Sequence, residues 1–143
     1  MTIARKPYLA LAAICALAIA PFAAAQQAAK VTVTVNKVMS DAGTIRGALC
    51  ADPLLFATSP CAAASAFAPA KAGSVELTFT DVKPGTYALG IFHDEDGNGQ
   101  VSIFTEPMAF GNGALDLPPV FDNASLKVSG DLKTETALFR MGQ

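Results

Sequence analysis

Several residue types are scarce in this chain of 143 residues, and each scarcity excludes a class of function. There is no Trp and only one His, which excludes any zinc site built on two or three histidines. Charged residues make up only 15% of the chain and the net charge is −2, so the basic excess of a nucleic-acid-binding protein is absent. With 52% hydrophobic residues, the chain is too apolar to be disordered, and it is too short for a multidomain enzyme.

The first 25 residues have the pattern of a secretory signal peptide. A basic start at Arg5 and Lys6 precedes an apolar run over residues 8–20 and small residues that end at Ala25. The run is too short to span a bilayer with margin, and no later apolar segment is long enough. We therefore expect cleavage after Ala25 and a periplasmic or secreted domain over residues 26–143. Its eight Lys and Arg against twelve Asp and Glu give a net charge of −4.

Two cysteines, Cys50 and Cys61, remain after the leader is removed. An oxidising compartment outside the cytoplasm and an even cysteine count favour one structural disulfide. Chain-entropy arithmetic for so short a loop gives a stabilisation of roughly 3 kcal/mol. Free thiols and a redox-active pair are the alternatives, although the spacing is not Cys-x-x-Cys.

Alternating apolar and polar residues dominate the rest of the chain and predict an all-β domain. The expected strands cover residues 30–36, 44–50, 74–80, 86–92, 125–129 and 134–140. Turn residues at 40–43, 81–85 and 129–131 separate them. This pattern predicts a single Greek-key β-sandwich of the immunoglobulin-like or transthyretin-like kind. The Ala-rich stretch 62–70, bounded by Pro60 and Pro69, is a candidate for a short helix.

A long connection after residue 92 opens with a run that resembles the first half of a calcium-binding loop. Such loops direct every second side chain inward and use glycines for the tight turn, because Ca²⁺ requires six to eight oxygen ligands. Side chains of the run would supply oxygens, as would one backbone carbonyl at Gln100. The candidate metal ligands in this run are Asp94, Asp96, Asn98, Gln100 and Ser102.

The match to that loop is incomplete at its end. The twelfth position, where a bidentate Glu is usual, is Thr105, and Glu106 comes one residue late. Glu106 or Asp116 would therefore have to complete the coordination. The alternative is a polar turn that holds no metal, since Asp-Gly and Asn-Gly are common turn dipeptides.

Three further residues are candidates for binding or catalysis. His93 ends a predicted strand beside the acidic run, where a lone histidine usually hydrogen-bonds locally but can also serve as a general base. Phe110 and Phe121 belong to a later segment rich in aromatics and prolines. That segment either caps the core or forms an aromatic binding surface.

Six ordered segments resemble the DUF2141 family of small exported bacterial proteins of unknown function. They cover nearly all of the mature chain, at residues 31–35, 43–49, 82–88, 92–99, 110–112 and 118–124. The most specific are the run from Pro84 to Asn98 and the Pro-Pro-x-Phe motif that ends at Phe121. The strand that follows Pro84 is also similar to carboxypeptidase regulatory-like and transthyretin-like sandwiches, which supports the fold and implies no activity.

The sequence therefore predicts an exported, non-enzymatic β-sandwich that acts as a binding or accessory module of the cell envelope. We expect it to be stabilised by Ca²⁺ through the loop 94–106. Its partner would be an envelope or extracellular ligand and not a nucleic acid, and the mature chain would have no transmembrane segment. The alternative is a small exported hydrolase that uses His93 with Asp94 or Asp96, although no nucleophile motif accompanies them.

Overall fold

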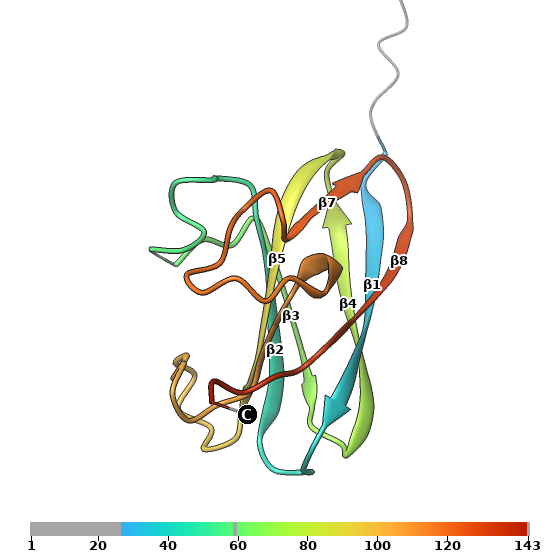
Figure 1. Ribbon diagram of the computed structural model, residues 1–143. Helices are drawn as coiled ribbons and strands as arrows, with labels where there is room; N and C mark the ends of the chain where they lie inside the picture. Colours follow the sequence, from blue (N-terminus) through green and yellow to red (C-terminus); the bar gives the residue numbers. More distant parts are fainter. Residues whose placement is uncertain (1–26, 59, 143) are drawn as a thin grey trace, which may run out of the picture.

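A computed structural model of the chain describes residues 27–58 and 60–142. The predicted signal peptide, residues 1–25, and its cleavage point lie outside this part. Figure 1 shows the described residues as two β-sheets that face each other. The strands are β1 (Ala29–Val38), β2 (Thr44–Cys50), β3 (Ala64–Pro69), β4 (Gly73–Val82), β5 (Gly85–Asp94), β6 (Met108–Phe110), β7 (Ser125–Val128) and β8 (Leu132–Ala137). This arrangement confirms the predicted all-β sandwich.

The smaller sheet has the strand order β4-β1-β8. β1 runs antiparallel to β4 and parallel to β8. Its alternating valines explain why it lies at the centre, because Val31, Val33 and Val35 are fully buried on the inner face. The β-branched side chains also favour an extended backbone.

The larger sheet has the order β3-β2-β5-β6, and β7 also pairs with β5. β6 pairs with residues 90–92 of β5, whereas β7 pairs with residues 85–88. The two short strands therefore follow each other along one edge of β5. The end of β5 that lies beyond β6 leads into the acidic run.

The main core lies between the two sheets. Its largest fully buried apolar side chains come from β2, β4 and β5: Ile45, Leu49, Leu77, Phe79 and Leu89. Gly47 faces them from the middle of β2, where a β-carbon would lie 2.9 Å from Leu77 and 3.0 Å from Phe79. A side chain at residue 47 would therefore require the Leu77 and Phe79 side chains to shift.

The predicted strands are found, with ends that differ by a few residues, but one predicted element is wrong. Residues 64–69, proposed as part of a short helix, form strand β3, which pairs antiparallel with β2 along its full length. Pairing supplies the backbone hydrogen bonds that an isolated Ala-rich helix would make for itself. The three-residue strand β6 was not predicted. Helix is confined, within the described residues, to the single turn η1 (Gly111–Gly113), which is far too short to cross a membrane.

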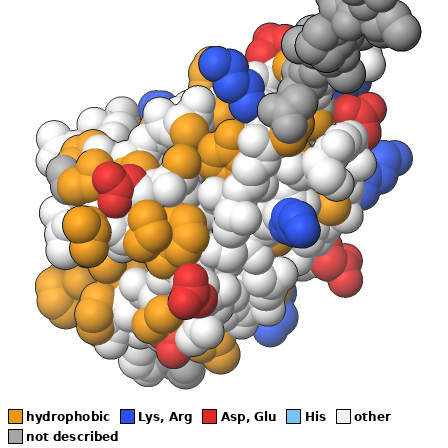
Figure 2. Space-filling model, turned by 90° about the horizontal axis from the view of Figure 1, so that it is seen from above, with side chains coloured by type: hydrophobic (Ala, Val, Ile, Leu, Met, Phe, Trp, Pro, Cys, Tyr) orange, Lys and Arg blue, Asp and Glu red, His pale blue; other side chains and the backbone are white. Residues whose placement is uncertain are grey.

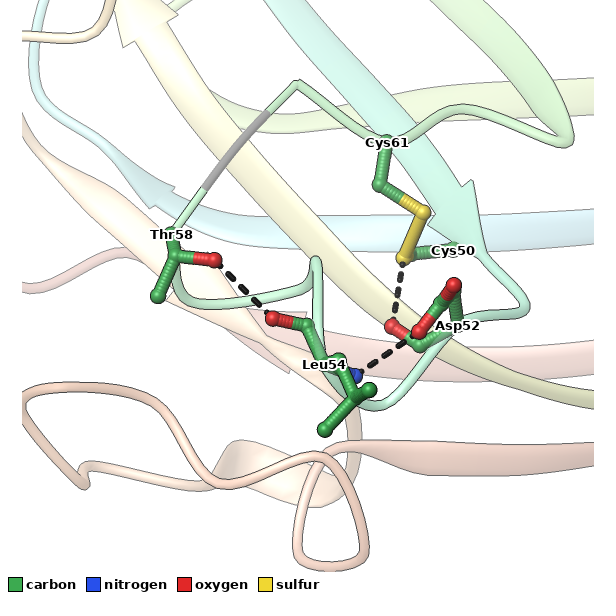
Figure 3. Close-up of a disulfide and its surroundings, with 5 residues drawn as sticks. All are labelled: Cys50, Asp52, Leu54, Thr58 and Cys61. Carbon is green, nitrogen blue, oxygen red and sulfur yellow. Dashed lines mark hydrogen bonds between the residues drawn. A yellow bond between two sulfur atoms is a disulfide. The ribbon is translucent and has the colours of Figure 1, made fainter.

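The disulfide between Cys50 and Cys61 is present, as predicted, with the two α-carbons 5.2 Å apart. Figure 3 shows that it closes the loop that follows β2. Inside the loop, Asp52 Oδ1 accepts the backbone N–H of Leu54 at 2.8 Å, and the Thr58 hydroxyl donates to the Leu54 carbonyl at 2.9 Å. The bridge therefore holds a compact, locally hydrogen-bonded loop at the end of the larger sheet.

Candidate functional site

The candidate site is the acidic loop, residues 94–107, between β5 and β6. Figure 1 shows it extending from the lower left of the sandwich, near the C-terminal end of the chain. Its first residue, Asp94, is still part of β5 and is fully buried. A carboxylate at a buried strand end needs compensating partners, because its desolvation is costly.

Arg46 on β2 is the principal partner of Asp94. Its Nε–H donates to Asp94 Oδ2 at 2.7 Å, and the backbone N–H of Gly99 donates to the same oxygen at 3.0 Å. Burial alone would raise the pKa of Asp94. The Arg46 hydrogen bond, the Gly99 N–H, the Arg46 charge and the Gly97 N–H together outweigh burial and lower that pKa. Asp94 is therefore held as an anion.

Three carboxylates converge at this point. One oxygen from each of Asp94, Asp96 and Glu106 lies within 4.8 Å of the others. Asp94 Oδ1 and Glu106 Oε1 are buried and have no hydrogen-bond partner among the described residues. Because buried polar atoms are nearly always paired, two unpartnered oxygens in one cluster are unusual.

The loop directs Glu106 inward by a local turn. The backbone N–H groups of Thr105 and Glu106 both donate to the Ser102 carbonyl, at 3.2 and 2.9 Å. Glu106 Oε2 accepts the Ser102 N–H at 3.0 Å, and the Glu106 side chain is buried. Thr105, at the twelfth position, is exposed and donates its hydroxyl to Ser102 Oγ at 2.7 Å. Counted from Asp94, Glu106 is the thirteenth residue of the loop. The turn thus directs Glu106 toward the other carboxylates, whereas the twelfth residue, Thr105, remains exposed.

Asp96 is the exposed member of the cluster, and Asn98 and Gln100, which follow it in the chain, are exposed as well. Asp96 accepts hydrogen bonds from the N–H and side-chain amide of Asn98, at 3.0 and 2.8 Å. Asn98 Oδ1 in turn accepts the Gln100 N–H at 2.6 Å. Asp116 lies in a different loop, where it accepts a hydrogen bond from Asn123 at 2.9 Å. Of the two residues proposed to complete the cluster, the structure brings Glu106 to it.

His93 lies beneath the loop and is fully buried. Its Nε2 contacts the Ala42 carbonyl at 2.6 Å, which makes Nε2–H the donor. Its Nδ1 lies 3.7 Å from Glu95 Oε1. The histidine therefore ties β5 to the turn between β1 and β2 and has no surface open to a substrate.

Two arginines that the motif reasoning missed hold the loop in place. Besides Arg46, Arg140 near the C-terminus donates to Glu95 Oε2 at 2.6 Å and to the Thr105 carbonyl. Neither arginine belongs to the acidic run, and only the folded chain brings them to it.

Phe110 and Phe121 take part in an aromatic cluster on the outer face of the larger sheet. Phe56 packs edge-on against both, with ring centroids 6.1 Å apart in each pair, and Phe110 also contacts Phe139 at 6.0 Å. Phe110 is buried and Phe121 is half-buried. The two rings thus contribute mainly to packing between the sheet and the loops around it.

Comparison with known proteins identifies a family. Neither the curated proteins nor the solved structures that were searched contain a match to this chain. One family model, described as "Uncharacterized protein conserved in bacteria (DUF2141)", matches residues 33–136, which run from β1 to β8 and include the whole acidic loop. The chain therefore belongs to the DUF2141 family.

Proposed function

We propose that the protein is an exported, non-enzymatic β-sandwich that binds Ca²⁺ through the loop 94–106 and acts as a binding or accessory module of the cell envelope. The observation that carries the proposal is the cluster of Asp94, Asp96 and Glu106 with its two unpartnered buried oxygens. Oxygens bound to one Ca²⁺ at about 2.3–2.6 Å lie at most about 5 Å apart. One oxygen from each of the three carboxylates lies within 4.8 Å of the other two, which meets this requirement.

The charges around the cluster favour a divalent cation. Arg46 is paired with Asp94, and Arg140 is paired with Glu95. No Lys or Arg in the described part of the chain forms an ion pair with Asp96 or Glu106. The negative charges of Asp96 and Glu106 therefore have no positively charged side chain paired with them, and one ion of charge +2 would neutralise both.

The donor chemistry favours Ca²⁺ over softer metals. The three convergent side chains offer oxygen only, and hard oxygen ligands suit Ca²⁺ and Mg²⁺ rather than copper or zinc. An irregular loop of this length suits the flexible coordination of Ca²⁺ better than the strict octahedron of Mg²⁺. The Gln100 carbonyl, the Ser102 hydroxyl and water are the ligands we propose for the remaining positions.

Other features support export and a non-enzymatic role. The leader pattern and the Cys50–Cys61 bridge both fit an oxidising compartment. A hydrolase that used His93 would need the imidazole beside its substrate, whereas this ring is fully buried and its Nε2–H is committed to Ala42. The hydrolase alternative is therefore not favoured.

Thermal unfolding of the mature protein in Ca²⁺ and in a chelator tests the proposal. Ca²⁺ at a hundred times its Kd would add about 2.7 kcal/mol and raise Tm by roughly 10 °C. We expect Glu106→Gln and Asp96→Asn each to reduce that shift, and native mass spectrometry to show one bound ion. The exposed Glu76 on β4 provides the control, because Glu76→Gln removes the same charge outside the loop.

Two results would overturn the calcium proposal. One is an unchanged Tm at millimolar Ca²⁺ together with a metal-free mass. The other is a Ca²⁺-induced shift that Glu106→Gln and Glu76→Gln leave equally intact, because the ion would then bind elsewhere.

A further inference from the structure

The acidic loop, residues 94–107, carries exposed apolar side chains in its second half as well as carboxylates. Val101, Ile103 and Phe104 are 55%, 43% and 78% exposed, and they lie between Asp96 and Glu106 in the sequence. None of the three belongs to either hydrophobic cluster of the described residues. Three large apolar side chains in one short solvent-exposed segment are unusual for a surface that has no partner.

Two other loops on the same side of the molecule share this character. Figure 2 shows hydrophobic side chains gathered on the left of the molecule, with acidic side chains among them and Lys and Arg mostly to the right. Three loops lie on that side in Figure 1: residues 51–61 and 111–124 lie toward the end that Figure 2 faces, and residues 94–107 lie at the opposite end. Their sequences contain seven Asp and Glu and no Lys or Arg. Their exposed large apolar residues are Leu54, Leu55, Val101, Ile103, Phe104, Leu115, Leu117 and Val120.

The shape of the acidic loop distinguishes it from a small-molecule pocket. Of two cavities in the described residues, one reaches the end of the loop at Pro107 and is also lined by Leu138 and Phe139, and the other lies beside Pro84 and Gly130. Neither is lined by Val101, Ile103 or Phe104. The three apolar side chains are instead exposed on a loop that extends from the sandwich (Figure 1), and such a loop can enter a soft or recessed surface.

We propose that the calcium-loaded loop docks on a phospholipid bilayer, with Phe104, Ile103 and Val101 entering the interface between headgroups and acyl chains. This inference rests on the proposed binding of Ca²⁺. Without the ion, the negative charge of Asp96 and Glu106 opposes approach to anionic headgroups. With the ion, those charges are neutralised, and Ca²⁺ accepts further oxygen ligands, which a lipid phosphate can supply.

The expected docking is weak and reversible, as for other shallow interfacial anchors. Each apolar side chain contributes in proportion to the area that it removes from water, and Phe104 offers the largest exposed fraction of the three. Loss of its ring should therefore weaken binding to vesicles by about tenfold or more.

Co-sedimentation of the mature protein with vesicles of phosphatidylcholine and phosphatidylglycerol tests the proposal. The expected result is binding in Ca²⁺ and release by a chelator, with weaker binding to vesicles of phosphatidylcholine alone. Phe104→Ser should weaken vesicle binding and keep the Ca²⁺-induced rise in Tm. Phe67→Ser is the matched control, because Phe67 is 75% exposed but lies on β3, and it should bind vesicles like the wild type.

The outcomes separate the two proposals. Native mass spectra that show bound Ca²⁺, with no vesicle binding, would overturn the docking and leave the calcium site standing. Vesicle binding that persists in chelator, or that Phe67→Ser weakens as much as Phe104→Ser, would also overturn it. Self-association driven by Ca²⁺ in place of vesicle binding would identify a second copy of the chain as the occupant and contradict the bilayer.

Discussion

Gly43 lies directly against the backbone of Asp94. A β-carbon on Gly43 would be 1.9 Å from the Asp94 carbonyl oxygen, and the φ angle of Gly43 is +73°. The turn after β1 therefore fits against the end of β5 only because residue 43 has no side chain. Close approach at this point also positions the Ala42 carbonyl to accept the hydrogen bond of His93.

Gly43→Ala should destabilise the protein by about 2 kcal/mol or more, because it adds a steric clash to an unfavourable φ angle. Chemical denaturation measures the change. Gly130→Ala is the control, since a β-carbon there meets no atom within 4 Å, and its effect should be small. Equal stability of the two variants would contradict the close packing of the turn on β5.

The ion pair of Arg46 and Asp94 should make stability depend on pH. Because the pKa of Asp94 is lowered from its ordinary value, the ionised carboxylate stabilises the fold above about pH 4. That contribution is lost as the pH falls through the lowered pKa. In chelator, Arg46→Met should therefore be less stable than the wild type near neutral pH, and the difference should shrink in acid.

Melting curves from about pH 6 down to about pH 2 check this dependence. Lys127→Met, which removes a positive charge from an exposed position on β7, should leave the pH profile unchanged. A difference between Arg46→Met and the wild type that stays constant across the range would show that Arg46 acts through packing and not through the Asp94 charge.

Loss of the disulfide should destabilise the protein by roughly 3 kcal/mol. The double variant Cys50→Ser with Cys61→Ser should unfold at lower denaturant concentration than the oxidised wild type, and a reducing agent should shift the wild type toward the variant. The variant itself should not respond to reductant. A wild type that is insensitive to reductant while its thiols become reactive would argue against a stabilising bridge.

Tyr87→Phe should cost about 1 kcal/mol, because its hydroxyl donates to the Lys83 carbonyl at 2.8 Å. Tyr87 is 8% exposed, so the phenyl ring of the variant keeps the apolar contacts and loses only the hydrogen bond. Urea denaturation measures the change. Unaltered stability would mean that water satisfies the Lys83 carbonyl equally well.

The strands that were predictable carry strong local patterns. Val31, Val33 and Val35 alternate with polar residues, and this period alone identifies β1. β3 was missed because the residues of 64–69 are mostly small, and alanine does not reveal whether a segment pairs with a neighbour. β6 was missed because three residues contain too little periodicity, and its partner on β5 lies at a distance in the chain.

The candidate site was partly predictable for the same reason. Asp94 and Asp96 belong to one local motif, and the order of oxygen-bearing residues identifies them without a structure. Glu106 emerged as one of two options, and the turn at Ser102 decided between it and Asp116. Arg46 and Arg140 reach the loop from other segments, and no local pattern connects them to it.

The sequence by itself determined the alternating strands, the acidic run and the pair of cysteines, because each depends on residues close together in the chain. Only the tertiary structure decided which oxygens lack partners, which arginines neutralise which acids, and that His93 is buried. Those properties arise from pairing between distant strands and from burial. Phe104 shows the difference, because its residue type is apolar and only the fold shows that its side chain is 78% exposed to solvent.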